Sequence, residues 1–500
     1  MSLKTKPSTS SSFYYEPTQT QSSQEHIMMQ DQPTSPDQKL TARNLSWKQN
    51  LTTEQDAAGN TSTADQQLNG DGLDNVPEKK KHKWKEPTAK EGLMAIIKSS
   101  WLNVLVVFIP IGIASHFTNW PATVPFIINF IAIIPLAKLL GFATEDLSLR
   151  VGEVLGGLLN ATFGNAVELI VSILALVKNL VPVVQASMLG SIISNLLLVL
   201  GMCFFFGGLK YKEQSFNVTA AQTSASLLFI ATSSLLLPAA FYGSAYGFSN
   251  QSQSKVAADV LNISRATSII LLIIYGAFLF FQLKTHKSFF LEAPKEASFF
   301  ERSSSRVRSD IEGANLEAEE EEEEEAPLMP LWMAMVLLAI ITALVAVCAE
   351  FLVDAIQEVC EQWGVSQTFV GLVLLPIVGN AAEHVTAVTV AYKNKMDLAL
   401  GVAVGSSMQI ALLVTPLMVI LGWIINIPMS LYFNMFETVV MLIAVLMVNY
   451  LIMDGKSNWL EGLMLFLVYI IIAISIYYYP SDGENSLAPT NSTSSNSTST

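Results

Sequence analysis

The chain has 500 residues, of which 51% are apolar and 14% charged, whereas about 25% of the residues in a typical soluble protein are charged. A net charge of −14, from 42 acidic and 28 basic residues, argues against nucleic-acid binding, which favours a basic surface, and the 3 cysteines are too few and too scattered for a disulfide framework or a zinc site. We therefore expect a membrane protein rather than a soluble enzyme, without catalytic residues and without a cofactor.

Polar segments frame the apolar part of the chain. Residues 1–91 are rich in Ser, Thr, Gln, Asn and Asp, so we expect a disordered cytosolic N-terminal tail without a cleaved signal peptide. Residues 481–500 predict a second disordered tail. Between the tails we predict a first transmembrane helix at 92–121, a five-helix repeat at 122–286, a cytosolic linker with an acidic helix at 287–328, and a second five-helix repeat at 329–480.

Apolar runs of the length that crosses a bilayer, about 20 residues, recur between the two tails. We count eleven, near 101–119, 122–144, 149–178, 183–208, 217–242, 260–283, 330–356, 366–391, 397–425, 434–453 and 458–479. Two of them lie close together at Pro121, so that counts of ten or twelve stay open. The fold class that we predict is an all-α polytopic membrane protein with about eleven transmembrane helices.

The positive-inside rule assigns an orientation to these spans. With a cytosolic N-terminus, nearly all Lys and Arg residues near the spans fall on the cytosolic side, and the other side receives Lys178 and Lys255, with Arg265 inside the sixth span. An odd number of spans then places the C-terminal tail on the opposite side, in a lumen or outside the cell. Asn491 and Asn496 of that tail head glycosylation sequons, which agrees with this placement, although such tripeptides are common by chance.

An internal repeat is the strongest signal in the sequence. Gly164–Glu168 (GNAVE) in the third span matches Gly379–Glu383 (GNAAE) in the eighth, at an offset of 215 residues (379 − 164). The same offset relates Gly190-Ser191 in the fourth span to Gly405-Ser406 in the ninth. Because five spans per copy is an odd number, the two copies must be inverted relative to each other. Inverted repeats are typical of secondary transporters, whose binding site lies at the midplane between the copies.

Two glutamates, Glu168 and Glu383, lie deep within apolar runs, where a charged side chain costs roughly 2.5–3.5 kcal/mol and marks a functional site by default. Neutralisation by a proton or a structural hydrogen bond would explain a single glutamate, but the pairing by the repeat argues against it. Asn165 and Asn380 each precede the glutamate of their motif by three positions, so each amide shares a helix face with its carboxylate. We predict that the two pairs form one ion- and proton-binding site at the midplane.

The oxygen chemistry of this site suits Ca²⁺, which takes about six to eight oxygen ligands. Two ionised glutamates would balance its double charge, and the absence of thiolates from the motifs argues against copper and zinc. We expect Gly164 and Gly379 to loosen their helices or to admit a neighbouring helix, with ordinary helix packing as the alternative. Pro376 is expected to kink the eighth span and to release backbone carbonyls.

The fourth and ninth spans add polar side chains at equivalent positions, Ser191 and Ser194 in one and Ser406 and Gln409 in the other. All four are candidate ligands, although a serine in a membrane helix often bonds only its own backbone. Gln409 differs from its counterpart Ser194, so the two half-sites are not chemically identical. His384, directly after the second motif, is expected either to relay or sense protons or to be an ordinary interhelical hydrogen-bonding residue.

The predicted linker contains an unbroken acidic run. Its members are Glu319, Glu320, Glu321, Glu322, Glu323, Glu324 and Glu325. The run is either a solvated, self-repelling linker or a cytosolic helix that attracts cations. In the second case it would form, with Glu145 and Asp146 at the cytosolic end of the second span, a low-affinity Ca²⁺ surface site that senses the supply of Ca²⁺ and adjusts transport.

The motifs GNAVE and GNAAEH, together with GSS-x-Q in the ninth span, closely resemble the Ca²⁺/H⁺ exchanger family of the Ca²⁺/cation antiporter superfamily, of the fungal and plant vacuolar type. The similarity covers roughly residues 92–480. The resemblance implies eleven spans, an acidic stretch between the sixth and seventh, and residence in a vacuolar membrane. It also implies roles for particular residues: Glu168 and Glu383 as essential ion-binding carboxylates, His384 as the family histidine, and Asn165, Asn380, Ser191, Ser406 and Gln409 as secondary ligands.

The transported ions that we expect are therefore Ca²⁺ and H⁺, with the lipid bilayer as the surroundings and no nucleic-acid partner. Cytosolic Ca²⁺ would bind between the two ionised glutamates, and lumenal protons would release it after the protein opens to the lumen. Mn²⁺ or another divalent cation as substrate and Na⁺ as counter-ion stay open, as do a cation channel and a membrane receptor with structural carboxylates. The sequence also leaves the oligomeric state open, a homo-oligomer included.

Overall fold

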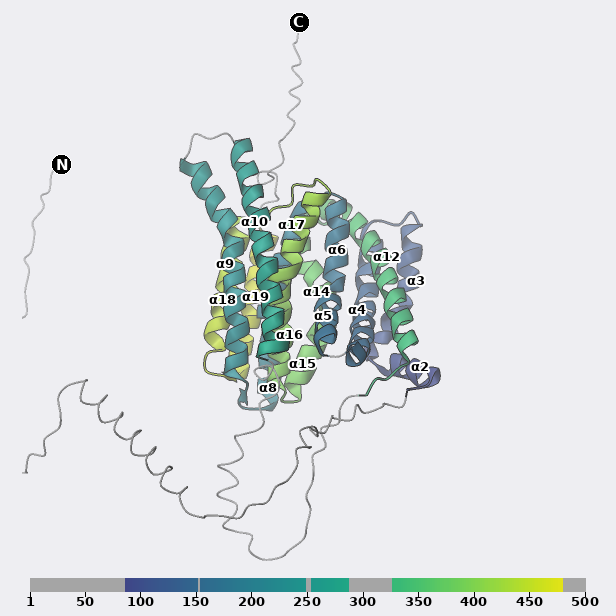
Figure 1. Cartoon of the computed structure of the whole chain (residues 1–500). Helices are drawn as coiled ribbons and strands as arrows, with labels where there is room; N and C mark the ends of the chain where they lie inside the picture. Colours follow the sequence, from purple (N-terminus) through teal and green to yellow (C-terminus); the bar gives the residue numbers. More distant parts are fainter. Residues whose placement is uncertain (1–85, 152, 249–252, 287–325, 480–500) are drawn as a thin grey trace, which may run out of the picture. The chain divides into compact units, whose positions relative to one another are not determined.

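The computed structural model of the chain describes residues 86–151, 153–248, 253–286 and 326–479 (Figure 1). Almost all of these residues are helical. The predicted tails, except residues 86–91 of the first, and the predicted linker, except residues 326–328, lie outside the described residues.

The helices of the first half are α2 (Ala89–Lys98), the 3₁₀ segment η1 (Trp101–Val107), α3 (Phe108–His116), α4 (Thr123–Val151), α5 (Glu153–Gly164), α6 (Ala166–Val177), α7 (Val181–Ile193), the π-helical η2 (Ser194–Val199), α8 (Leu200–Lys210), α9 (Val218–Phe248), α10 (Gln253–Phe280) and the π-helical η3 (Phe281–Thr285). Those of the second half are α12 (Leu331–Trp363), α13 (Gln367–Phe369), the π-helical η5 (Val370–Leu374), α14 (Leu375–Gly379), α15 (Ala381–Tyr392), α16 (Met396–Gln409), the π-helical η6 (Ile410–Val414), α17 (Thr415–Ile424), α18 (Met435–Leu451) and α19 (Trp459–Tyr477). Two short strands, β1 (Gln214–Ser215) and β2 (Lys456–Ser457), pair antiparallel.

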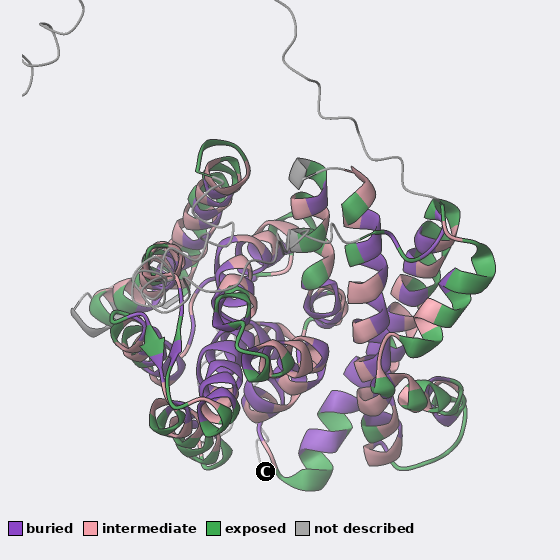
Figure 2. Ribbon diagram, turned by 90° about the horizontal axis from the view of Figure 1, so that it is seen from below, coloured by how far each residue is buried: buried purple, intermediate pink, exposed green. Residues whose placement is uncertain are grey.

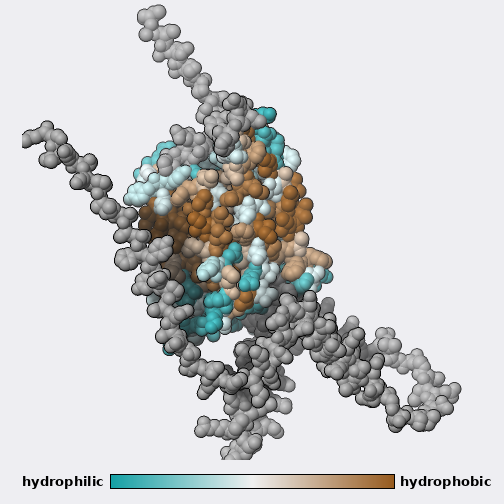
Figure 3. All heavy atoms as spheres, turned by 90° about the vertical axis from the view of Figure 1, so that its left-hand side faces the viewer, coloured by the Kyte–Doolittle hydropathy of each residue, from teal (hydrophilic) through white to brown (hydrophobic). Residues whose placement is uncertain are grey.

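Long apolar helices account for the predicted spans. Within the described residues, 7 helices are long and apolar enough to cross a membrane, or up to 10 spans if each of 3 bent helix pairs is one span, and α18 is a shorter apolar helix. Each of the eleven predicted runs coincides with one of these helices or pairs. Hydrophobic side chains gather in a band on the face seen in Figure 3, with hydrophilic ones above and below it, as expected for a protein surrounded by lipid. The number of helices that cross the membrane stays a prediction.

The core is built on the fourth and ninth predicted spans. In the most apolar window of the continuous helix Val181–Lys210, 72% of the residues are buried, and in that of Met396–Ile424 61% are buried, against 22% for Ser254–Thr285. Buried residues accordingly gather on the central helices in Figure 2, whereas the outer helices present exposed faces. These two central helices carry Ser191 and Ser406, so the candidate ligands lie on the best-packed elements of the protein.

The two halves of the chain make matched contacts. α4 packs on α12 and α9 packs on α18, and each of these pairs joins equivalent helices of the two copies. α8 packs on α19, and its equivalent α17 packs on α10, just as α6 packs on α12 and α15 on α4. The start of α4 lies beside the end of α12, where the Thr123 hydroxyl donates to Gln362 Oε1 (2.9 Å). The end of α4 lies beside the start of α12, where Asp146 accepts from the Leu328 amide (2.5 Å). The equivalent helices α4 and α12 therefore run antiparallel, as an inverted repeat requires.

Local backbone features repeat with the same offset of 215 residues. The π-helical turns η2 and η6 interrupt the two central helices at nearly equivalent places: η2 begins at Ser194, and η6 begins at Ile410, directly after Gln409, the equivalent of Ser194. Asn179 (φ 59°) and Asn394 (φ 63°) each adopt the left-handed conformation in the turn after their motif helix. Asparagine tolerates this conformation better than most residues, so both copies use the same residue to end equivalent helices.

Candidate ion-binding site

Both motif-bearing spans are broken at the asparagine of the motif. α5 and α6 are separated only by Asn165, and α14 and α15 only by Asn380. The chain bends by 51° at the first break and by 58° at the second. Asn165 (φ −103°, ψ 24°) and Asn380 (φ −93°, ψ 4°) have nearly the same non-helical backbone. Each copy therefore presents a helix N-terminus, whose free amide groups favour negative charge, at the equivalent place.

The two motif carboxylates lie in the first turns of α6 and α15 and meet between the copies. Glu168 is only 4% exposed. Its carboxylate reaches the break in the other copy, where a Cβ added at Gly379 would come within 2.6 Å of Glu168 Oε1. Glu383 is half-buried, and its carboxylate lies close enough to that of Glu168 for the two charges to interact. The structure thus brings together the two glutamates that are 215 residues apart in sequence.

A chain of hydrogen bonds fixes the amide of the first motif. Asn165 Nδ2 donates to Gln409 Oε1 (2.6 Å), and the Ser406 hydroxyl donates to Asn165 Oδ1 (3.0 Å). Asn195 Nδ2 in turn donates to Ser406 Oγ (3.1 Å). Asn195 is not among the site residues predicted from the sequence. Its amide inside an otherwise apolar run could have identified it as a candidate. These bonds hold one side of the site in a single arrangement.

The other side of the site has polar atoms without such bonds. Within the described residues, no hydrogen-bond partner is found for Glu168 Oε1, Glu383 Oε2, Ser191 Oγ or either side-chain polar atom of Asn380, all of which are buried. Buried polar atoms are almost always paired. Two carboxylate oxygens, an amide oxygen and a hydroxyl left unpaired therefore match what a hard cation or a proton would need.

The set of donors fits Ca²⁺ better than a soft metal ion. The polar atoms of the site are carboxylate, amide and hydroxyl oxygens, which are the ligands that Ca²⁺ prefers. Among the described residues, no group of three or more His, Cys, Asp and Glu side chains is placed to hold a metal ion. Neutral oxygens would therefore have to complete the coordination shell around the two glutamates.

The Ser194 hydroxyl bonds within its own helix, and Gly164 faces open space among the described residues. The Ser194 hydroxyl donates to the Ser191 carbonyl of its own helix (3.3 Å), which is the packing role that membrane serines often have. A Cβ added at Gly164 would meet no other atom within 4 Å, so no neighbouring helix approaches there, in contrast with the close approach at Gly379.

The bend in the eighth span lies at Asn380, not at Pro376 as the sequence suggested. Pro376 lies within the continuous helical run Gln367–Gly379, which extends three residues beyond it before the break. The turn before it, Val370–Leu374, widens into a π-helix, and such a widened turn accommodates a local break in the ordinary helical pattern.

His384 is buried beside the site. It directly follows Glu383 on α15, so its side chain leaves the helix about 100° away from that carboxylate. The residue is 8% exposed, and no partner for Nε2 is found among the described residues. The relay or sensing of protons by His384 stays a prediction.

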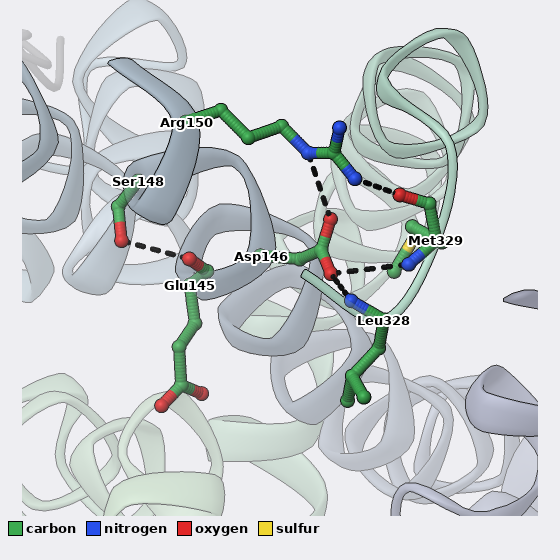
Figure 4. Close-up of polar contacts among 6 residues, drawn as sticks. All are labelled: Glu145, Asp146, Ser148, Arg150, Leu328 and Met329. Atoms are coloured by element: carbon green, nitrogen blue, oxygen red, sulfur yellow. Dashed lines mark hydrogen bonds and ion pairs between the residues drawn. The ribbon is translucent and has the colours of Figure 1, made fainter. Parts of the chain in front are cut away.

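Glu145 lies apart from the site, at the end of α4. Its side chain points away from Asp146, which is buried and accepts from the amides of Leu328 (2.5 Å) and Met329 (3.3 Å) (Figure 4). Arg150 Nε lies 3.6 Å from Asp146, and the guanidinium also donates to the Met329 carbonyl. A cavity of about 380 Å³ here is lined by Phe142, Glu145, Asp146, Leu149, Ala326 and Leu328. The acidic run at 319–325 lies outside the described residues, so its pairing with Glu145 stays a prediction.

Comparison with known proteins places this arrangement in context. Residues 121–284 and 333–478 match the family of sodium/calcium exchanger proteins. The chain is 46% identical to the vacuolar calcium ion transporter of Schizosaccharomyces pombe over 77% of its length and 87% of that protein. It is 44% identical to the Ca²⁺/H⁺ antiporter of Aphanothece halophytica over 75% of its length and 96% of that protein.

A solved structure shows the same fold. The Ca²⁺/H⁺ antiporter protein YfkE superimposes with a TM-score of 0.59 and 36% sequence identity, covering 76% of this chain and 99% of that one. The predicted all-α polytopic membrane fold is therefore confirmed, apart from the number of spans.

Proposed function

The chain belongs to the sodium/calcium exchanger protein family, and we propose that it is a secondary active transporter that exchanges cytosolic Ca²⁺ for lumenal H⁺ by alternating access. Its relatives include proteins named as vacuolar calcium ion transporters and Ca²⁺/H⁺ antiporters, which supports Ca²⁺ and H⁺ as the transported ions and the vacuolar membrane as the location. The transport would sequester Ca²⁺ in the vacuole.

The observation that carries this proposal is the meeting of Glu168 and Glu383 between two inverted halves of the chain. Oε1 of Glu168 and Oε2 of Glu383 are buried without partners among the described residues, next to the unpaired side chain of Asn380. A site built from both halves can open to one face of the membrane and then to the other, as the halves rock against each other. Neither half contains the full site, so ion binding and the rocking motion are coupled.

Protons and Ca²⁺ exclude one another at such a site. Two ionised carboxylates balance the charge of one Ca²⁺ ion, and two protons neutralise the same carboxylates in its absence. Both loaded forms are therefore nearly neutral, which lowers the cost of moving the site through a region of low dielectric constant. The form with two ionised carboxylates and no bound ion carries two negative charges, so it costs the most free energy to move through this region. Because the empty site does not readily return, transport of Ca²⁺ in one direction is coupled to transport of protons in the other.

We further propose that the N-terminus is cytosolic and the C-terminus lumenal. Lys210, Lys393 and Arg150 then lie on the cytosolic side, together with most other basic residues near the helix ends. In this orientation, α15 leads from the carboxylates toward the cytosol.

Uptake of Ca²⁺ into vesicles of the full-length protein, with an acidic interior as the energy source, tests the proposal. We expect Glu168→Gln and Glu383→Gln each to abolish this uptake, because one ionised carboxylate cannot balance a divalent cation at the buried site. Glu361→Gln is the matched control, since it changes an exposed glutamate near the end of α12 and should leave uptake unchanged.

Three outcomes would contradict the proposal: normal uptake by either site variant, wild-type uptake that survives a protonophore, or wild-type uptake that is driven by a Na⁺ gradient instead of a proton gradient. Repeating the assay with Mn²⁺ decides the breadth of the substrate class.

A further inference from the structure

A lysine lies in the middle of α4, within the membrane-spanning part of the protein. Lys138 is half-buried, and its ammonium donates to the Thr386 hydroxyl oxygen (3.2 Å). Thr386 Oγ1 spends its own hydrogen on the Ala382 carbonyl (2.9 Å), so toward Lys138 it acts as an acceptor. The ion pairs among the described residues involve other side chains. Lys138 is therefore a cationic group held by a neutral partner inside a membrane helix, where ionisable residues usually mark an ion path.

Its partner places the ammonium close to the ion site. Thr386 follows Glu383 by three positions on α15, and residues at that spacing are neighbours on one helix face with Cβ atoms about 5–6 Å apart. The Lys138 ammonium consequently lies on the order of 10 Å from the Glu383 carboxylate. Along α15 it lies further toward Tyr392 than the carboxylate does, which is the side proposed to face the cytosol.

The other half of the protein has no equivalent charge. With the offset of 215 residues, Lys138 corresponds to Val353 on α12 and Thr386 corresponds to Val171 on α6, and both valines are buried. A lysine and its acceptor on one side of the site are thus replaced by two apolar side chains on the other. The fold itself does not require the charge, because the equivalent helix contact is made without one.

We propose that Lys138 is a built-in positive charge that lowers the affinity of the site for cytosolic Ca²⁺ by repelling the ion without touching it. This inference rests on the proposed function of the Glu168–Glu383 site. The repulsion scales with the charge of the approaching ion, so a divalent cation is affected more than a monovalent one. At this separation and an effective dielectric constant of about 40, between those of protein and water, the effect on Ca²⁺ affinity is on the order of tenfold.

The test is the dependence of the initial uptake rate on cytosolic-side Ca²⁺ in vesicles of the full-length protein with an acidic interior. Lys138→Met, which keeps the length of the side chain and removes its charge, should lower the apparent KM for Ca²⁺ on the order of tenfold, with a smaller change in the maximal rate. Lys138→Arg keeps the charge and should keep the wild-type KM. Thr386→Val removes the hydrogen bond and keeps the charge, so it should also keep the wild-type KM.

Lys138→Gln provides a second neutral variant if the methionine variant is not recovered in membranes. An unchanged KM in the neutral variants, or an equal fall of KM in Thr386→Val, would overturn the inference. Absence of proton-driven Ca²⁺ uptake in the wild type would instead overturn the proposed function, so the two failures are distinguishable.

Discussion

A single carboxylate oxygen of one half of the chain, Glu168 Oε1, lies against the backbone of the other half at Gly379. The sequence predicted that these residues matter, because the repeated motif pairs the glutamates and places glycines beside them. It could not predict that Gly379 makes a close approach and Gly164 does not, since the two motifs are identical at that position. The difference arises from contacts between helices, which a sequence repeat does not encode.

That contact makes a prediction for Gly379→Ala. The added Cβ would come within 2.6 Å of Glu168 Oε1, so the carboxylate must move away from its position between the copies. We expect uptake to fall on the order of tenfold or more, because small displacements of binding groups have large effects on rate. Gly164→Ala, with no neighbour within 4 Å, is the matched control and should transport nearly normally. Equal rates for the two alanine variants would contradict this account of Gly379.

The polar network shows the same limit of sequence reasoning. Ser406 and Gln409 were nominated as ligands by their positions in the repeat, and the structure places both against Asn165. Asn195 was missed because its counterpart under the repeat is the apolar Ile410, so the symmetry argument gave no reason to select it. A search by symmetry alone therefore overlooks a polar residue that only one copy carries, even though an amide inside an apolar run is itself a signal.

At the scale of helices, the positions and lengths of the apolar runs were predictable, because the bilayer fixes the length of a span. The π-helical turns and the breaks at the motif asparagines were not. The sequence drew attention to Pro376, whereas the bend lies at Asn380. A break of this kind is stabilised by what surrounds it, here the carboxylate of the opposite copy and the polar chains of the central helices.

The junction of α4 and α12 makes a prediction about stability. Asp146 accepts from two backbone amides at the start of the second half and pairs with Arg150 (Figure 4). Asp146→Ala would leave the buried Met329 amide and the partly buried Leu328 amide without this acceptor, and an unsatisfied buried donor costs about 1–3 kcal/mol. We expect a lower midpoint of thermal unfolding and faster hydrogen exchange at Leu328 and Met329. Ser148→Ala is the control: it removes a bond to the Glu145 carbonyl (2.7 Å) and should change neither the unfolding midpoint nor the exchange rates. An unaltered exchange rate at Leu328 and Met329 in Asp146→Ala would contradict the proposed role of Asp146 at this junction.

At the scale of the whole molecule, the antiparallel packing of α4 on α12 agrees with an inverted repeat, which the odd number of spans per copy had predicted. The orientation in the membrane stays a prediction from charge. Lys178 and Lys393 occupy equivalent positions at the ends of α6 and α15, so inversion places them on opposite faces of the membrane.

Single cysteines at these two positions test the orientation. In a chain whose buried native cysteines, Cys203, Cys348 and Cys360, are replaced by alanine, we expect Lys393→Cys to react with an impermeant thiol reagent from the cytosolic side. Lys178→Cys should react only after the vesicles are opened. Labelling of both variants from the same side would contradict the inverted arrangement. If instead Lys178→Cys reacts from the cytosolic side and Lys393→Cys reacts only after the vesicles are opened, the inverted arrangement holds and the proposed orientation in the membrane is wrong.

The central claim is that protons and Ca²⁺ compete for the same two carboxylates, one from each half of the chain. Its most direct test is to measure Ca²⁺ binding and proton release together, by titrating Ca²⁺ into purified protein in weakly buffered, mildly acidic solution. We expect the wild type to release protons in proportion to the Ca²⁺ that it binds, and Glu168→Gln and Glu383→Gln to do neither. Binding without proton release, or wild-type binding by either variant, would contradict the account.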